Sequence, residues 1–516
     1  MTGAVGRTQS ESAAYVEPLP RKLVSTGESS AVSQPFDDTV IPSSHQYRTI
    51  VLCFDGTGDQ FDADNSNIVQ LFSMLKKDDR SQQMVYYQAG IGTYTVPQIA
   101  TPFMASLDKT IDMAIGNHLD AHVMSGYEFL MQNYQAEDKI CLFGFSRGAY
   151  TARSLAGMIH KVGLLPACNH QQVPFAYKMY TREDEIGWKQ STAFKKAFSV
   201  DVEIEFLGVW DTVSSVGLNE RRLPFTASNT AIRFFRHAIS LDERRAKFKA
   251  KHFQPSPPHV CDLGVQPGEM PRSNQTRHPH SHHQDHRHTS AKHLEEHYDD
   301  GPRQSDSLEV WFAGCHCDVG GGSVPNGTRN SLARISLRWM IRQIFLAGTG
   351  IQFHRNTFAD IGMDPTSLYP IVLPRPPALP ATPSLAGKSA RTVREQTEGT
   401  LVEEPQAAED AAATMRSEEE EDAADAVSPL YDMLRLKKGW WILEVLPLRQ
   451  RVKQKENLKW EHDISWNLGR ARVIPEQEGH KVYIHRSVKI RMDAEDLKGG
   501  KYKPRPELPH KFEWAD

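Results

Sequence analysis

The feature that most constrains this chain is the pentapeptide at 144–148, Gly-Phe-Ser-Arg-Gly, which follows a strand-like apolar run and opens a helix-like stretch that ends at Val162. A strand that turns sharply into a helix around Gly-x-Ser-x-Gly is the context of a nucleophile elbow. The tight turn forces Ser146 into strained backbone angles, and only glycine at Gly144 and Gly148 lets strand and helix approach closely enough. The pattern predicts a serine hydroxyl presented at the top of a sheet.

Strand-like and helix-like segments alternate around this pentapeptide. Buried-strand patterns occur at 47–54, 139–143, 202–210 and 308–313, and helical spacing of apolar residues at 110–134, 149–162 and 332–345. Such alternation predicts an α/β fold of the α/β-hydrolase type, with a mainly parallel sheet flanked by helices and with long disordered inserts. In open sheets of this kind, ligands bind at the carboxyl ends of the strands.

Changes in composition divide the chain into four parts. We expect a disordered tail at 1–45, a catalytic domain at 46–373 with a low-complexity insert at 254–305, a disordered Pro-rich and acidic insert at 374–429, and a segment at 430–516 that completes the domain. The first insert contains a His-rich run at 278–288, which we interpret as solvated low-complexity sequence.

Charge and cysteine content exclude several classes of protein. A formal net charge of -4 gives no basic field for nucleic acid, and six cysteines in 516 residues are too sparse for a disulfide scaffold. The polar N-terminal region lacks the apolar core of a secretory signal, and no apolar run reaches the roughly 20 residues of a membrane span. We therefore expect a cytoplasmic protein without a transmembrane segment.

Four of the predicted strands end in residues that suggest chemistry. Asp55 is followed by Gly56-Thr57-Gly58, the pentapeptide follows the second strand, Asp211 ends the third, and His316 follows the fourth, ahead of three glycines. Because the carboxyl ends of parallel strands meet at one edge of a sheet, these residues are expected to converge.

Three of these residues form a candidate catalytic triad. A serine hydroxyl is a poor nucleophile at neutral pH, so it needs a base within hydrogen-bond reach, and the base needs an orienting carboxylate. Ser146, Asp211 and His316 occur in the chain order of α/β-hydrolases. Ser146 would attack an acyl carbonyl, His316 would carry its proton, and Asp211 would orient the imidazole.

The same pattern predicts an oxyanion hole. One donor would be the backbone N–H of Arg147, directly after the nucleophile, and the second would come from the loop Gly56-Thr57-Gly58.

Each assignment has a structural alternative. Asp211 could cap a helix, His316 could be a structural histidine, and Asp55 could organise its loop rather than take part in chemistry. Asp318 could orient the histidine in place of Asp211, or organise the glycine loop through backbone hydrogen bonds. The run Cys-His-Cys at 315–317 is not expected to bind metal, because adjacent ligands in a strand point to opposite faces.

Five segments occur in a distinctive order: 51–58 with Asn65 and Asn67, 87–92, 144–150, 208–213 and 311–322. Together they resemble one α/β-hydrolase family, the catalytic domain of type VI secretion phospholipase effectors, which also has many uncharacterised intracellular members in fungi. The similarity covers about residues 47–346. Residues 484–491 and 502–504 look like the closing segment of the domain. Cys317 stands where we would expect serine.

The resemblance implies a lipolytic hydrolase with Ser146, Asp211 and His316 as its triad. His485 is the alternative base, because it also stands at the end of a predicted strand, late in the chain. We expect a serine esterase that acts on lipid or phospholipid acyl esters, with no cofactor and no metal, and with transient contact to a membrane surface. A peptidase or thioesterase with the same triad is the alternative enzyme. A non-catalytic interaction protein on a hydrolase scaffold is the alternative without chemistry.

Overall fold

The computed structural model describes residues 39–44, 46–57, 59–90, 104–213, 222–254, 305–381, 416–453, 460–475, 481–495, 497 and 500–516. An eight-stranded sheet lies at the centre of this fold. The strands are β2 (Thr49–Phe54), β3 (Gln83–Gln88), β4 (Lys139–Phe145), β5 (Ile204–Trp210), β6 (Ile232–Ser240), β7 (Asp306–Phe312), β11 (Tyr483–His485) and β12 (Glu513–Ala515). They lie in the order β12-β11-β7-β6-β5-β4-β2-β3, and all neighbours are parallel. The predicted α/β class is confirmed.

The strand order reverses direction at β2. From β2 the chain moves outward to β3, then returns to β4 on the other side and continues away through β5, β6 and β7. In open α/β sheets, ligands bind at the carboxyl ends of the strands beside such a switch point, which are here the strands that end at Phe54 and Phe145.

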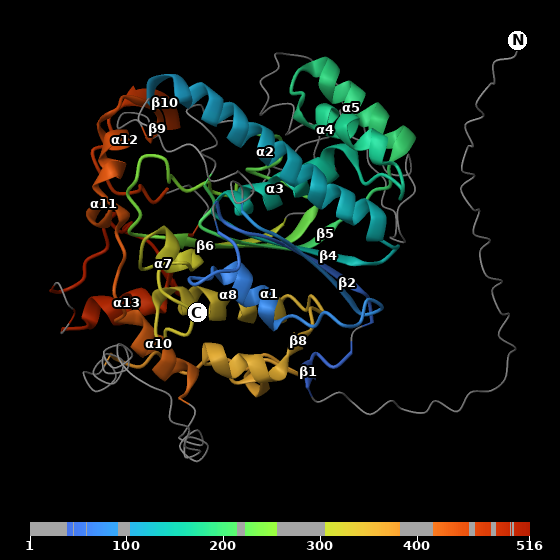
Figure 1. The fold of residues 1–516 in the computed structure, drawn as a ribbon. Helices are drawn as coiled ribbons and strands as arrows, with labels where there is room; N and C mark the ends of the chain where they lie inside the picture. Colours follow the sequence, from blue (N-terminus) through green and yellow to red (C-terminus); the bar gives the residue numbers. More distant parts are fainter. Residues whose placement is uncertain are drawn as a thin grey trace, which may run out of the picture. The chain divides into compact units, whose positions relative to one another are not determined.

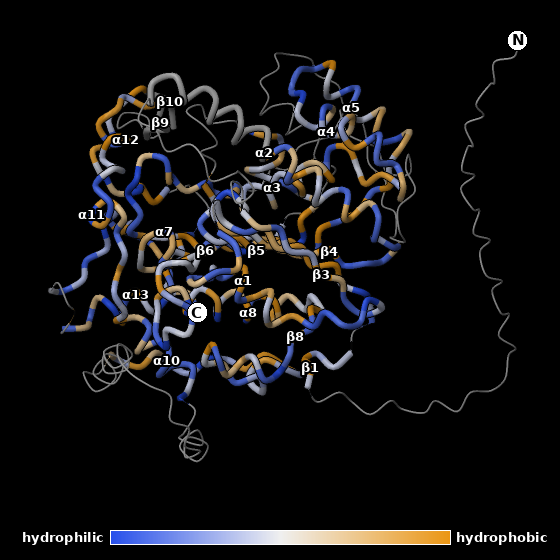
Figure 2. Tube along the Cα trace, in the orientation of Figure 1, coloured by the Kyte–Doolittle hydropathy of each residue, from blue (hydrophilic) through white to orange (hydrophobic). Residues whose placement is uncertain are grey.

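Helices cover both faces of the sheet (Figure 1). On one face lie α2 (Met104–Asn133), α3 (Ser146–Val162), α4 (Val173–Thr181) and α5 (Glu185–Phe198); on the other lie α1 (Asn67–Met74) and α8 (Leu332–Leu346). Successive residues of β4 pack into opposite layers: Ile140 and Leu142 toward α3, Cys141 and Phe143 toward α8. Both faces are therefore buried, and apolar residues colour the centre of the sheet in Figure 2.

Smaller elements surround this core. They are the paired strands β1 (Val40–Ile41) and β8 (Phe353–His354), the hairpin β9 (Leu448–Lys453) and β10 (Trp460–Ser465), the helices α7 (His316–Gly320), α11 (Met433–Leu436), α12 (Trp441–Val445) and α13 (Arg486–Asp493), and 3₁₀ turns at His170–Gln172, Arg355–Ile361, Pro365–Ser367 and Lys438–Trp440. The expectation of disorder up to residue 45 was wrong for β1, because its backbone pairs with β8. Among the described residues, no helix has the length and apolar composition needed to cross a bilayer.

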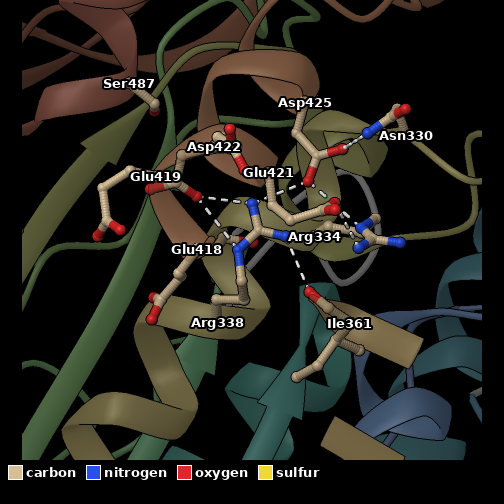
Figure 3. A network of polar contacts seen from close by, with 12 residues as sticks. Asn330, Arg334, Arg338, Ile361, Glu418, Glu419, Glu421, Asp422, Asp425 and Ser487 are labelled. Carbon is tan, nitrogen blue, oxygen red and sulfur yellow. Dashed lines mark hydrogen bonds and ion pairs between the residues drawn. The ribbon is translucent and has the colours of Figure 1, made fainter. Parts of the chain in front are cut away.

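The acidic stretch that was expected to be disordered contains a helix. α10 (Glu418–Ala426) begins with a capping box at Ser417 and packs along α8 and α13. Arg338 lies at the centre of the contact and is bound to Asp422 at 2.6 Å and Asp425 at 2.8 Å, while it donates to the carbonyl of Ile361 (Figure 3). The prediction failed here because the cations that neutralise this run lie far away in the sequence.

Further arginines extend the same contact. The ion pairs join Arg329 and Arg334 to Glu421, Arg342 to Glu418, Arg375 to Glu419 and Asp422, and Arg486 to Glu419. Most of the two predicted inserts, at 255–304 and 382–415, lies outside the described residues, and so does the His-rich run.

Candidate active site

The predicted strand, sharp turn and helix are present around Ser146. β4 ends at Phe145, Ser146 adopts a φ of 58°, and α3 begins at the same residue. A Cβ on Gly148 would lie 2.4 Å from the carbonyl oxygen of Phe54 and 2.3 Å from that of Asp55. The helix can press against the end of β2 only because residue 148 is glycine, which is what a nucleophile elbow requires.

Ser146, His316 and Asp211 form one continuous hydrogen-bonded chain. The Oγ atom of Ser146 lies 2.8 Å from Nε2 of His316, and Nδ1 of His316 lies 2.6 Å from Oδ2 of Asp211. All three side chains are buried. This geometry allows Nδ1–H to donate to the carboxylate, which leaves Nε2 free to accept the serine proton.

Asp211 has a strained backbone conformation, and both of its carboxylate oxygens accept hydrogen bonds. Its φ of 38° places it in the left-handed region, directly after β5. Its carboxylate accepts from the backbone N–H of Ser240 at 2.9 Å and from both terminal nitrogens of Arg472, at 2.5 and 2.9 Å. Burial alone would raise the pKa of Asp211, but Arg472 and His316 outweigh it and hold the pKa well below its usual range.

His316 lies between two aromatic rings at the start of α7. Its ring is 4.7 Å from that of Phe145 and 4.8 Å from that of Phe248. Burial lowers the pKa of His316, and the hydrogen bond with Asp211 opposes that shift only in part. The imidazole is therefore poised to be neutral, as a general base must be.

Asp318 organises the loop that carries the histidine. Its Oδ2 atom accepts from the backbone N–H of Cys315 at 2.9 Å and from that of Tyr431 at 3.0 Å. Burial raises the pKa of Asp318 to about 6. The sequence left two roles open for Asp318, as the partner of the histidine or as the organiser of its loop. The structure places Asp318 on the loop, and Asp211 occupies the position beside the imidazole.

Asp55 also organises a loop. Its carboxylate accepts from the backbone N–H of Gly56 at 2.8 Å, from Ser66 Oγ at 2.6 Å and from the Tyr87 hydroxyl at 2.7 Å. The amide of Gly56 is thus engaged by Asp55, which argues against Gly56 as an oxyanion donor. Thr57 remains as a candidate from this loop, and Gly58 lies outside the described residues.

Arg147 occupies the first turn of α3, directly after the serine. Backbone N–H groups in a first turn have no acceptor within their own helix, so this amide is available to a ligand oxygen. The side chain is mostly buried, and burial lowers the pKa of its guanidinium. Within the described part of the chain, the guanidinium makes no hydrogen bond or ion pair.

His485, the alternative base, lies elsewhere. It ends β11 and caps α13, where its Nδ1 atom accepts from the Ser487 N–H at 3.3 Å and lies 2.8 Å from the Ser487 hydroxyl. Its ring stacks on Phe312 at 4.7 Å. Burial lowers the pKa of His485 to about 3. The structure brings His316, and not His485, to Ser146.

The sequence did not point to two charged residues, Arg472 and Glu243, that contact Asp211 and His316. Arg472 lies in an unremarkable Gly-Arg-Ala-Arg-Val stretch. Glu243, whose carboxylate accepts from the backbone N–H of His316 at 3.3 Å, follows β6, which was not predicted. No local pattern signalled Arg472. Among the described residues, no cluster of three or more His, Cys, Asp or Glu side chains is arranged to hold a metal ion.

The parallel sheet, the serine at the turn after β4 and the histidine after β7 define an α/β-hydrolase-like protein. The model of the type VI secretion (T6SS) phospholipase effector Tle1-like catalytic domain matches residues 48–343, more than half of the chain, and the chain belongs to this family. The expected resemblance is thereby confirmed.

Individual relatives carry little functional information. An uncharacterised protein of Saccharomyces cerevisiae, YEL023C, is 30% identical over 559 residues, which cover 88% of this chain and 80% of the relative. A crystal structure of an uncharacterised Pseudomonas aeruginosa protein is 20% identical over 59% of this chain and 46% of its own, with a TM-score of 0.30. The Tle1 effector bound to the VgrG spike of the Type 6 secretion system is 18% identical over 55% and 52%, with a TM-score of 0.25. The chain spans about half the length of these two solved structures.

Proposed function

We propose that this chain is a serine hydrolase that cleaves carboxylic esters, with lipid or phospholipid acyl esters as its substrate class. The observation that carries the proposal is the unbroken chain of hydrogen bonds from Ser146 through His316 to Asp211. The phospholipase named in the description of the family supports the choice of an acyl ester.

The proposed reaction passes through an acyl-enzyme. Ser146 Oγ attacks the ester carbonyl while its proton moves to Nε2 of His316, and the imidazolium then gives that proton to the leaving alcohol. Water next attacks the acyl-serine, with His316 again taking a proton and returning it to Ser146. Asp211 keeps the proton of the neutral imidazole on Nδ1 and stabilises the imidazolium.

The negative oxygen of the tetrahedral intermediate would bind to backbone amides. The N–H of Arg147 is the first proposed donor, and the second lies in the loop after β2, at Thr57 or Gly58. Gly56 contributes by holding this loop through Asp55.

An exposed apolar surface near the site favours contact with a membrane. It consists of six exposed side chains, Leu436, Trp441, Ile442, Val445, Leu446 and Leu468. Three exposed cations, Arg435, Lys437 and Lys438, lie in the same stretch, while Glu444 is fully buried. Apolar side chains flanked by cations suit a bilayer with anionic headgroups, which we propose as the transient partner.

This apolar surface is adjacent to the catalytic histidine that we propose. The ring of Trp440 lies 5.5 Å from that of Phe248, which in turn contacts His316. An enzyme docked by this surface would have its base close to the lipid.

A fluorophosphonate probe tests the hydrolase. We expect the wild-type protein to be labelled and Ser146→Ala to lose the label, whereas Ser154→Ala, the same change on the same helix at a hydroxyl bound to the Tyr150 carbonyl, keeps it. A folded wild-type protein that takes no label would favour the interaction protein instead. Rates on matched oxyester, thioester and peptide substrates then decide between the esterase and the alternative enzymes.

Vesicle sedimentation tests the membrane contact. The wild-type protein should sediment with vesicles that contain phosphatidylserine and much less with pure phosphatidylcholine. Ile442→Glu should abolish this binding, and Ile186→Glu, at an exposed isoleucine of α5, should not. Equal binding of both variants would refute the assigned surface.

A further inference from the structure

Arg472 is the one buried arginine or lysine among the described residues that forms an ion pair with Asp211, the proposed catalytic carboxylate. Its Nη1 atom lies 2.5 Å from Oδ1 of Asp211 and its Nη2 atom 2.9 Å from Oδ2, so the guanidinium binds as a two-point fork. The same side chain donates to the carbonyl oxygens of Ser240 and Phe248 and to the Ser240 hydroxyl. Asp211 and Arg472 are both buried.

Arg472 and His316 donate to the same oxygen of Asp211. Oδ2 of Asp211 accepts from Nδ1 of His316 and from Nη2 of Arg472, and Oδ1 accepts from the other nitrogen of Arg472 and from the Ser240 N–H. Four donors thus occupy the carboxylate, which leaves it little freedom to rotate. A cation this close also weakens the attraction between the carboxylate and an imidazolium.

The segment that supplies Arg472 is anchored to the loop after β6. Glu444 accepts from the N–H groups of Ala246 and Gly469, and Asn467 donates to the Arg244 carbonyl. These contacts and the bonds of Arg472 lie along residues 240–248, between the strand end that fixes Asp211 and the ring of Phe248 that packs on His316. The C-terminal segment is therefore built into the site rather than appended to it.

We propose that Arg472 is a positioning residue of the hydrolase: it fixes the carboxylate of Asp211 and withdraws part of its negative charge from His316, so that His316 stays a neutral base near neutral pH. The inference rests on the proposed function, since it assigns Arg472 a part in the same relay.

Other charges near His316 do not replace this effect. Glu243 and Arg245 face the histidine from the loop after β6, but they bind each other at 2.8 Å and act on the pKa of His316 in opposite directions. Lys249, on the same loop, binds the side-chain oxygen of Asn467 and does not reach the carboxylate. Asp211, with Arg472 bound to it, is the ion pair on the Nδ1 side of the imidazole.

The test compares Arg472→Gln with Arg472→Lys and with Arg470→Gln, an exposed arginine of the same segment. The pKa of His316 is followed by NMR of the full-length protein with isotope-labelled histidine, assigned with His316→Gln. The rate of fluorophosphonate labelling is followed as a function of pH, and thermal unfolding reports the fold. For Arg472→Gln we expect the pKa of His316 to rise by about one unit, which slows labelling at pH 7 by up to about threefold. Loss of the fork slows it a few-fold more, to about tenfold in all.

Arg472→Lys retains the charge but loses the fork, so its histidine should titrate as in the wild type while labelling slows a few-fold. Arg470→Gln should match the wild type in both. An unchanged pKa of His316 in folded Arg472→Gln overturns the inference, even if labelling falls. If Arg472→Gln does not fold, wild-type labelling of Arg472→Lys overturns it. Absence of Ser146-dependent labelling in the wild type refutes the proposed function alone, because the titration of His316 needs no turnover.

Discussion

His316 follows β7 and His485 ends the neighbouring strand β11 of the same sheet, and the two histidines have different surroundings. His316 sits between a serine hydroxyl and an ionised carboxylate, each in direct contact with one ring nitrogen. His485 uses one nitrogen to cap α13, and its Nε2 atom is buried with no hydrogen-bond partner among the described residues. Position at a strand end is therefore not enough to place a histidine between a serine and a carboxylate.

The difference lies in what each ring nitrogen can do. Burial lowers the pKa of both histidines, but His316 has Asp211 to stabilise its charged form. Near His485, Asp422 favours the charged form, while neighbouring arginines disfavour it. A histidine that must gain and lose a proton needs a partner for the proton. One that stacks and caps needs only to remain neutral.

The largest expected effect is the difference in kcat/KM between variants of His316 and of His485. His316→Gln should lower kcat/KM for an ester substrate by on the order of 10⁴-fold or more, because the proton of Ser146 has no acceptor. His485→Gln should leave kcat/KM within a few-fold of the wild type. Steady-state kinetics with a chromogenic ester measure both, and comparable losses in the two variants would break the comparison.

The next effect concerns the ion network above His485. Arg338→Met should destabilise the fold by about 3–5 kcal/mol, because Asp422 and Asp425 lose their most buried cation. Chemical denaturation measures the change, and Arg435→Met, at an exposed arginine, is the control. Fluorophosphonate labelling of folded Arg338→Met should remain normal. Slower labelling would show that the network supports Ser146 after all.

A smaller effect is the pH dependence of stability. The folded pKa of His485, about 3, lies below its ordinary value of 6.5, so the unfolded state takes up a proton first as the pH falls. The contribution of this group is complete above pH 6.5 and declines toward pH 3, by about 2 kcal/mol between pH 7 and 5. The free energy of unfolding of His485→Gln should lack this component, and parallel curves for the two proteins would contradict it.

The smallest effect is on the pH dependence of activity. Because burial lowers the pKa of His316 below 6.5, its neutral form persists into mild acid, and the acid limb of kcat/KM should have its midpoint below pH 6.5. A pH series on the wild-type protein measures the midpoint. A midpoint above 6.5 would mean that the carboxylate outweighs burial.

The sequence predicted the parts of the fold that follow from local patterns. The runs that end before Asp55, Ser146 and Asp211 became β2, β4 and β5, because strands buried on both faces are apolar along their length. β6 escaped prediction because Arg236 and His237 interrupt its apolar run, although both are buried and paired with Asp306 and Glu309.

In the candidate site, too, residues that a local sequence pattern marks could be predicted, and residues without such a pattern could not. Ser146, Asp211 and His316 could be chosen because each follows a strand and the chain order suits the chemistry. Arg472 could not, since its partner lies 261 positions away and nothing in its own neighbourhood marks it. The acidic helix α10 was misread for a similar reason: its neutralising arginines come from distant segments.

The location of Arg472 also bears on how the working unit of this protein is delimited. The matched family region ends at residue 343, yet the arginine that binds Asp211 and the strands that complete the sheet come later in the chain. A fragment cut at the family boundary would keep the serine, the histidine and the aspartate but lose the cation behind them. The matched family region and the folded unit that contains the candidate site therefore have different ends, and fragments meant for expression or exchange between relatives need to extend through the C-terminal segment.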